Sequence, residues 1–343
     1  MRPLQLRSTT CGLWLIALAL GLGLAEARGD TALPAPQQIE ALERAQAAVV
    51  GVRATAVDEA GSIATLGRER RGSGVIIGPD DLVLTIGYLI LEADHVDLIL
   101  EGDRVVPARV LAYDLASGFG LLQPLAPLRT APVVLGRSAT LAPGEALIVA
   151  SSGPEPALGL VRLVSRRPFS GYWEYHIDDA LFTAPARGDH SGAALFSTTG
   201  ELMGIGSLRV SNTLGGTVGQ LPGNMFVPVD LLRPILGELL ERGAARLSTR
   251  AWLGLSSVEH DGTVRVLRVS PDSPAERAGL RQGDLIERLD GREVTDLETL
   301  YKALWQGGAE REVTLEIRRG TRPLTVTARS VDRMKTLQRP LGI

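Results

Sequence analysis

The sequence predicts a mainly β protein built from two modules that follow an N-terminal leader. Between Val49 and Val229, short runs of valine, isoleucine and leucine alternate with glycine, proline and aspartate turns, which is typical of an all-β barrel or sandwich. Residues 230–242 then carry leucines at helical spacing and predict a helix that ends at Gly243. From Trp252 onward, strand-like runs alternate with two short helical stretches, which predicts an α+β module.

The first 27 residues resemble a secretory signal. Arg2 and Arg7 supply positive charge, the apolar run 13–24 is short for a membrane span, and residues 25–27 fit a small-residue cleavage site. An uncleaved membrane anchor is the alternative. We expect export to a periplasm or cell envelope, with no stable membrane span after cleavage. The single cysteine, Cys11, lies in this leader, so we expect a mature chain without disulfides.

The first module is expected to span residues 48–243, after a linker and short helix at 28–47. Its predicted strands are short apolar runs bounded by turn residues, at 49–52, 74–77, 83–85, 96–100, 105–110, 121–123, 146–150, 194–196 and 202–205.

The second module is expected at residues 250–332, before a tail at 333–343. A Pro-Asp-Ser-Pro turn at 271–274 opens a helix, Ala275 to Ala278, and Asp296 caps a longer amphipathic helix. Asp290-Gly291 is a strong hairpin signal. The predicted strands of this module are 252–256, 263–269, 285–289, 312–317 and 324–328.

The composition argues against several classes of function. The chain has 343 residues, a formal net charge of −3 and no basic stretch of the kind that binds nucleic acid, so no nucleic-acid partner is expected. The pattern of histidine, cysteine and acidic residues shows no metal-binding spacing, and the glycine-rich Leu214-Gly215-Gly216 lacks the context of a phosphate-binding loop. We therefore expect no metal and no cofactor.

Three motifs in order resemble the HtrA/DegP family of trypsin-like serine proteases. Residues 84–89, Leu-Thr-Ile-Gly-Tyr-Leu, are similar to the family's segment around the catalytic histidine, and residues 114–122 are similar to its segment around the catalytic aspartate. Residues 191–195, Ser-Gly-Ala-Ala-Leu, resemble the nucleophile loop. Residues 270–286 resemble the family's PDZ domain. The resemblance implies a trypsin-like double six-stranded β-barrel followed by an α+β PDZ domain.

The chain departs from the family at the positions that perform catalysis. The resemblance places Ser191 at the nucleophile position, Tyr88 at the histidine position and Gly118 at the aspartate position. A serine hydroxyl is a weak nucleophile without an adjacent base, and a phenol with an ordinary pKa near 10 stays protonated at neutral pH. The family's oxyanion hole uses the backbone N–H groups of the serine and of a glycine two residues before it. That position is Asp189 here, unless the loop carries a one-residue insertion, and its carboxylate opposes developing negative charge.

Replacements for the missing base are poorly placed in the sequence. The two lysines, Lys302 and Lys335, both lie outside the barrel module. Of the four histidines, His260 falls in the second module, and we expect the other three to pack or to lie on the surface; they are His95, His176 and His190. A rescue of Ser191 by His190, its neighbour in sequence, stays open as an alternative.

The PDZ resemblance implies peptide binding by addition of an extended segment to a sheet edge, with a terminal carboxylate held by backbone N–H groups. It places the carboxylate loop at Trp252, Leu253, Gly254 and Leu255, and assigns Leu300 and Leu304 to the pocket, with inward core packing as the alternative for both leucines.

The sequence is interpreted as a secreted pseudoprotease that binds peptides, unfolded segments or protein C-termini, with a regulatory, scaffold or chaperone-like role in envelope protein quality control. The alternative is an active periplasmic serine endopeptidase that uses Ser191 with a non-standard base. Partners considered are a second copy of the chain and an active HtrA-like relative. The family's trimer is not carried over, because residues 28–60 contain no aromatic side chain.

Overall fold

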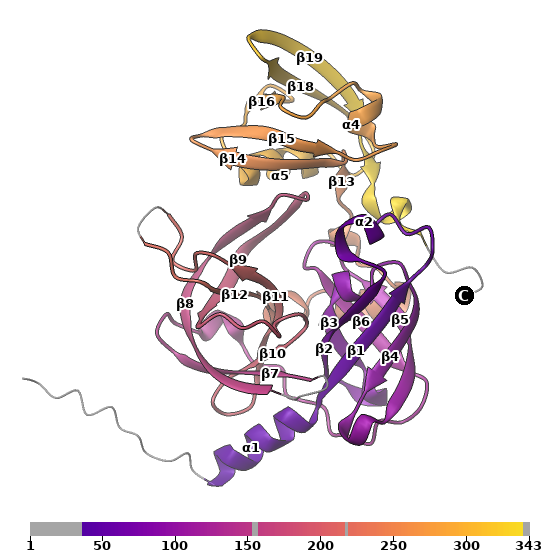
Figure 1. The fold of residues 1–343 in the computed structure, drawn as a ribbon, viewed down its shortest axis with the longest axis vertical. Coiled ribbons are helices and arrows are strands. Elements are labelled where there is room, and N and C mark those ends of the chain that lie inside the picture. Colours follow the sequence, from indigo (N-terminus) through magenta and orange to yellow (C-terminus); the bar gives the residue numbers. More distant parts are fainter. Residues whose placement is uncertain (1–35, 153–156, 217–218, 339–343) are drawn as a thin grey trace, which may run out of the picture. The chain divides into compact units, whose positions relative to one another are not determined.

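The computed structural model describes residues 36–152, 157–216 and 219–338. They form two closed six-stranded barrels and a third module with its own sheet (Figure 1). The expected mainly β double barrel followed by an α+β module is confirmed. The predicted leader, with Cys11, lies outside these residues. Within the described part of the chain, no helix is long and apolar enough to cross a membrane.

The first barrel closes in the strand order β1-β2-β3-β6-β5-β4. Each of its six strands overlaps one of the predicted apolar runs, and helix α1 (Pro36–Ala47) precedes them as expected. A short helix that was not predicted, α2 (Ile63–Leu66), lies between the first two strands. The strands are β1 (Val49–Ala56), β2 (Glu69–Ile76), β3 (Val83–Ile86), β4 (Ala93–Ile99), β5 (Val105–Tyr113) and β6 (Phe119–Pro124).

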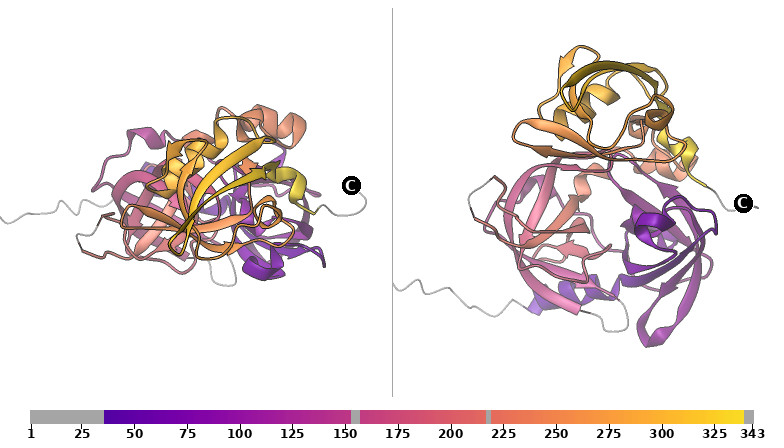
Figure 2. Two further views of the ribbon diagram at one scale, coloured as in Figure 1. Left: turned by 90° about the horizontal axis from the view of Figure 1, so that it is seen from above. Right: turned by 45° about the horizontal axis from the view of Figure 1, so that its top comes forward.

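The second barrel closes in the order β10-β11-β12-β9-β8-β7, and Figure 2 shows the two barrels as separate closed sheets from another direction. Three of its strands, β8, β9 and β12, were not predicted. The first two interrupt their apolar residues with arginines or aspartates, and β12 begins with glycine and ends with proline, as a turn does. The strands are β7 (Ala146–Ser151), β8 (Ala157–Gly171), β9 (Tyr175–Ala184), β10 (Ala194–Phe196), β11 (Leu202–Val210) and β12 (Gly223–Pro228).

The predicted helix at 230–242 is wrong in its first half. Only α3 (Leu236–Arg242) is α-helical, and it ends at Gly243 with φ +71°, the left-handed conformation that glycine favours. Pro234 explains the late start, because it lacks an N–H group and disfavours helical geometry at the residue before it. Short 3-10 turns occur at η1 (Pro79–Asp81), η2 (Gly87–Leu89), η3 (Glu101–Asp103), η4 (Ser138–Thr140), η5 (Val229–Leu231), η6 (Arg246–Ser248) and η7 (Arg333–Thr336).

The third module is a six-stranded sheet with two helices and a separate two-stranded pair, β13–β20. The expected strand at 252–256 is divided by Gly254, whose φ of +86° turns the chain between β13 and β14. A capping box at Asp296 begins α5 as predicted. The elements are β13 (Ala251–Trp252), β14 (Leu255–His260), β15 (Thr263–Val269), α4 (Pro274–Arg277), β16 (Leu285–Leu289), β17 (Arg292–Glu293), α5 (Leu297–Trp305), β18 (Glu312–Arg319), β19 (Arg322–Arg329) and β20 (Val331–Asp332).

A buried ion pair secures the third module. The Asp284 carboxylate is fully buried and accepts hydrogen bonds from Nε and Nη2 of Arg319, both at 2.8 Å, and from the Arg281 N–H at 2.9 Å. Burial alone raises the pKa of Asp284, but the hydrogen bonds from Arg319 and Arg281 outweigh it and hold this pKa below its usual range. The charged carboxylate is therefore part of the folded structure.

We expect Asp284→Asn to lower the free energy of unfolding of this module by about 1–3 kcal/mol, because a buried donor set loses its charged acceptor. Since the folded-state pKa lies below the unfolded value, the stabilisation is present above about pH 4 and is lost as pH falls through the folded value. Thermal unfolding followed by circular dichroism measures both effects. The control is Asp261→Asn, whose side chain is 88% exposed; an equal loss in both variants would contradict the role of the pair.

Candidate functional site

Ser191 lies in the loop between β9 and β10, where the second barrel approaches strand β2 of the first. Its carbonyl accepts a hydrogen bond from the Ser73 N–H at 2.8 Å. The next residue, Gly192, has φ +71°, and a Cβ atom there would lie 2.0 Å from the Ser73 carbonyl oxygen. The close approach of the two barrels therefore requires glycine immediately after the serine.

Tyr88 lies beside this serine, in η2 at the end of β3. Its hydroxyl donates a hydrogen bond to the Ser207 carbonyl at 2.8 Å. Burial raises the pKa of Tyr88 to about 12, although a hydrogen bond with the Ser191 side chain lowers it in part. With its pKa raised, the phenol stays protonated at neutral pH, and a neutral phenol oxygen is too weak a base to remove the proton of Ser191.

Gly118 is joined to the same region by its carbonyl, which accepts a hydrogen bond from the Gly87 N–H at 2.6 Å. The space beside Gly118 is filled by Tyr175, since a Cβ atom on the glycine would lie 3.1 Å from the tyrosine hydroxyl. That hydroxyl donates to the Ser117 carbonyl at 2.7 Å, and burial raises the pKa of Tyr175. The structure thus brings Tyr88, Gly118 and Ser191 together, with a tyrosine where a carboxylate is expected.

Asp189 is paired with the side chain of Arg187, which donates from Nε at 3.0 Å and from Nη2 at 2.5 Å. The Ser151 hydroxyl also donates to this carboxylate. Burial raises the pKa of Asp189, but the bonds from Arg187 and Ser151 outweigh this effect and leave the pKa lowered. The residue expected to supply an oxyanion N–H therefore carries a charged carboxylate, which opposes developing negative charge nearby.

Each histidine has a hydrogen-bond partner elsewhere. His190 Nδ1 lies 3.2 Å from the Arg187 carbonyl, and burial lowers its pKa. The remaining three pair with nearby acidic or hydroxyl groups: His95 with Asp97, His176 with Ser170 and Asp178, and His260 with Asp261.

One cluster has ligand types suited to a metal, namely His176, Asp178 and Glu298. Lys302 lies among these groups, with its Nζ 2.7 Å from Asp178 Oδ1 and 2.6 Å from Glu298 Oε1. The single ammonium group therefore pairs with both carboxylates at the place where a metal ion would lie.

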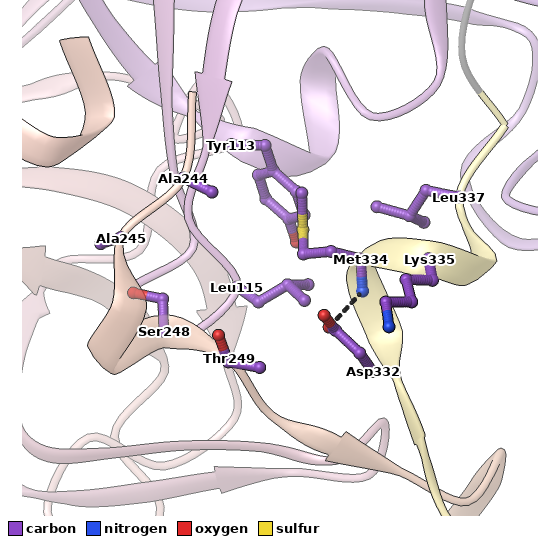
Figure 3. A pocket seen from close by; sticks show the side chains of 10 residues that line it. All are labelled: Tyr113, Leu115, Ala244, Ala245, Ser248, Thr249, Asp332, Met334, Lys335 and Leu337. Carbon is purple, nitrogen blue, oxygen red and sulfur yellow. Dashed lines mark hydrogen bonds between the residues drawn. The ribbon is translucent and has the colours of Figure 1, made fainter. Parts of the chain in front are cut away.

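Two cavities open on the described surface. One, of about 400 Å³, is lined in part by Ser191, Asp189 and Arg71, which leaves the serine open to an extended segment. Another, of about 570 Å³, lies between Tyr113, the 244–249 connector and residues 332–337 (Figure 3). In the second cavity the Asp332 carboxylate already accepts from the Met334 N–H at 3.0 Å. The lining residues of that cavity include none of the predicted site residues.

The predicted carboxylate loop does bind a carboxylate. That carboxylate is the side chain of Glu174, which was not predicted from the sequence. The N–H groups of Leu253, Gly254 and Leu255 donate to the Glu174 side chain, at 3.1, 2.9 and 2.8 Å. Burial raises the pKa of Glu174, and these N–H groups together with Arg333 oppose the rise. Glu174 belongs to the turn between β8 and β9, whose aromatic neighbours Tyr172, Trp173 and Tyr175 were the only sequence signal.

Leu300 and Leu304 are 2% and 1% exposed and lie in the core of the third module, which agrees with the core-packing alternative for them. The residue of α5 that reaches the Glu174 turn is Tyr301. Its hydroxyl donates to the Gly171 carbonyl at 2.7 Å and accepts from the Glu174 N–H at 3.3 Å. Trp252, at the end of β13, lies next to Gly254, since a Cβ atom on that glycine would be 3.1 Å from the indole.

Comparison with known proteins agrees with this architecture. Residues 72–205 match the trypsin-like peptidase domain and residues 251–329 match the PDZ domain. The chain is 28% identical to serine endoprotease DegS of Haemophilus influenzae, with 65% of each chain covered. It is 27% identical to a probable periplasmic serine endoprotease DegP-like of Marinomonas sp., covering 76% of this chain and 56% of the relative. The chain thus spans less than two thirds of the length of these relatives.

Solved structures show the same fold. The HtrA-type protease AlgW with decapeptide aligns with a TM-score of 0.54 at 20% identity, covering 88% of this chain and 99% of that one. The serine endoprotease from Yersinia pestis aligns with a TM-score of 0.53 at 21% identity, covering 88% of this chain and 99% of that one. Two domain matches in order, together with the double barrel and the third sheet, identify the chain as an HtrA/DegP-like protein with a trypsin fold and a C-terminal PDZ domain.

Proposed function

We propose that this chain is a secreted HtrA/DegP-like pseudoprotease that binds peptides or protein C-termini through its PDZ domain. The observation that carries the proposal is the partner of Ser191, which is the hydroxyl of the partly buried Tyr88, with a raised pKa, in place of an imidazole. In a comparable triad, loss of the base lowers turnover by roughly six orders of magnitude. The proposed role of such a peptide-binding protein is regulatory, scaffold or chaperone-like, in envelope protein quality control.

The surroundings of Ser191 support the same conclusion. Tyr175 fills the space where an acid would orient a base, and the residue expected to supply an oxyanion N–H, Asp189, carries a charged side chain. Acyl transfer depends on preorganised donors aimed at the developing oxyanion, and removing one such donor costs about 2.7–4 kcal/mol. The base and the acid are therefore both missing, and the expected oxyanion donor lies beside a negative charge.

The PDZ domain retains what carboxylate recognition requires. Three successive N–H groups, from Leu253 to Leu255, converge on one carboxylate, and β14 offers a sheet edge to an extended segment. The relative from Marinomonas is named as periplasmic, and the expected leader supports the same location for this chain. Assembly with a second copy or with an active relative is part of the proposal, and co-purification from the envelope tests it.

The alternative, an active endopeptidase, rests on the retained Ser191 and on relatives named as serine proteases. We expect unfolded casein to be cleaved no faster by the mature chain than by its Ser191→Ala variant, because Tyr88 cannot accept the serine proton. Release of acid-soluble peptides over time measures this. A rate that depends on Ser191 would overturn the pseudoprotease proposal, and the variant itself serves as the control for contaminating proteases.

For the PDZ domain, we expect a peptide with a hydrophobic C-terminal residue to bind more tightly as the free acid than as the amide. Charge-assisted hydrogen bonds to the three N–H groups are worth about 1.5–3 kcal/mol, so the difference in Kd should be about tenfold or more. Fluorescence anisotropy with the two forms of one labelled peptide measures it. Equal affinities would argue against carboxylate recognition.

A further inference from the structure

The PDZ carboxylate loop is occupied by the chain itself. Both oxygens of the Glu174 side chain take part: Oε1 accepts from the Gly254 and Leu255 N–H groups, and Oε2 accepts from the Leu253 N–H. Glu174 is buried, with 6% of its surface exposed. A terminal carboxylate from another chain would need these same three donors, so the two carboxylates exclude one another.

The backbone that leads to Glu174 also lies as a bound peptide would. Strand β14 donates the Ser257 N–H to the Tyr172 carbonyl at 2.9 Å. Ser257 is two residues after Leu255, and Tyr172 is two residues before Glu174, so the segment runs antiparallel to β14. Addition of an extended segment to a sheet edge uses this type of pairing, with a carboxylate at one end.

The conformation of Glu174 shows that the contact is not a by-product of an ordinary hairpin. Gly171 pairs with Tyr175, so residues 172–174 form a three-residue turn between β8 and β9. Its last residue, Glu174, has φ +58°, the left-handed region that such a turn normally gives to glycine. Glutamate thus occupies a backbone conformation that glycine adopts with the least strain, and its carboxylate lies in the carboxylate loop.

The 172–174 turn is clamped from two other sides. Tyr301 of α5 bonds to Gly171 and Glu174, and Arg333 Nη1 donates to the Trp173 carbonyl at 2.9 Å. The positive charge of Arg333 also favours the charged form of Glu174. The contact therefore involves the loop, the helix and the segment that follows the domain.

We propose that Glu174 is a built-in ligand of the PDZ groove, whose side-chain carboxylate takes the place of a peptide's terminal carboxylate, so that a free-acid peptide binds only after displacing the 172–174 turn. The inference rests on the proposed peptide-binding function, because it assigns that function a competitor within the same chain. Apparent affinity falls in proportion to the fraction of molecules in which the groove is open.

Three variants of the full chain after removal of the predicted leader test this competition. Glu174→Gln keeps the size and removes the charge, and Glu174→Gly removes the side chain at a φ that glycine adopts freely. The control is Asp178→Asn. Asp178 lies in β9, and its carboxylate pairs with Lys302 of the PDZ domain but makes no contact with the carboxylate loop. The probe is one labelled peptide ending in valine, as free acid and as amide.

We expect both Glu174 variants to bind the free acid about tenfold or more tightly than the wild-type chain does. Asp178→Asn should stay within about threefold of the wild type, as expected for an exposed ion pair. Unchanged affinity in both Glu174 variants would overturn the built-in ligand. An equal gain in all three variants would overturn it too, since it would assign the effect to the domain contact as a whole.

Hydrogen–deuterium exchange without peptide separates this inference from the proposed function. Amides of residues 253–255 should exchange fastest in Glu174→Gly, which removes their acceptor, and faster in Glu174→Gln, which leaves one neutral acceptor oxygen, than in the wild type or Asp178→Asn. If they do so while no protein distinguishes acid from amide, the internal carboxylate contact is supported and the peptide-binding function is overturned. If exchange at 253–255 does not change in Glu174→Gly, the built-in ligand is overturned whatever the peptide does.

Discussion

The burial of one carboxylate, that of Glu174, sets the relation between the second barrel and the PDZ domain. A buried charge costs several kcal/mol unless hydrogen bonds and an opposite charge compensate for it. Here the N–H groups of Leu253, Gly254 and Leu255 provide the hydrogen bonds, and Arg333 provides the opposite charge. Because the acceptor belongs to one domain and the donors to the other, the charge is compensated only while the hairpin stays against the loop.

The same hairpin affects the barrel site through the next residue along the chain. Tyr175 directs its hydroxyl to the Ser117 carbonyl and fills the space beside Gly118, while Trp173 stacks on its ring at 5.5 Å between centroids. One short segment thus supplies the PDZ loop with a carboxylate and the barrel with a buried aromatic group. A second tyrosine, Tyr88, lies in the same site and donates a hydrogen bond to the Ser207 carbonyl.

The sequence predicted the architecture well because apolar runs bounded by turn residues report directly on strands that are buried in a barrel. It failed where charged or turn-forming residues occupy strands, as in β8, β9 and β12, and where Pro234 shortens a helix whose leucines keep a helical period. The motif positions Tyr88, Gly118 and Ser191 were found because they are local patterns. Glu174, Tyr175 and Tyr301 were missed because their roles depend on contacts between residues more than fifty positions apart, which no spacing along the chain encodes.

The filling of the space beside Gly118 also limits which substitutions that position accepts. An aspartate at this position would meet the Tyr175 hydroxyl and would have to adopt φ +81°. Introducing a histidine at residue 88 and an aspartate at residue 118 would therefore also require a smaller side chain at residue 175. Members of a triad act as a unit, so no one of these substitutions is expected to confer activity alone. Packing thus makes three positions that are distant in sequence depend on one another.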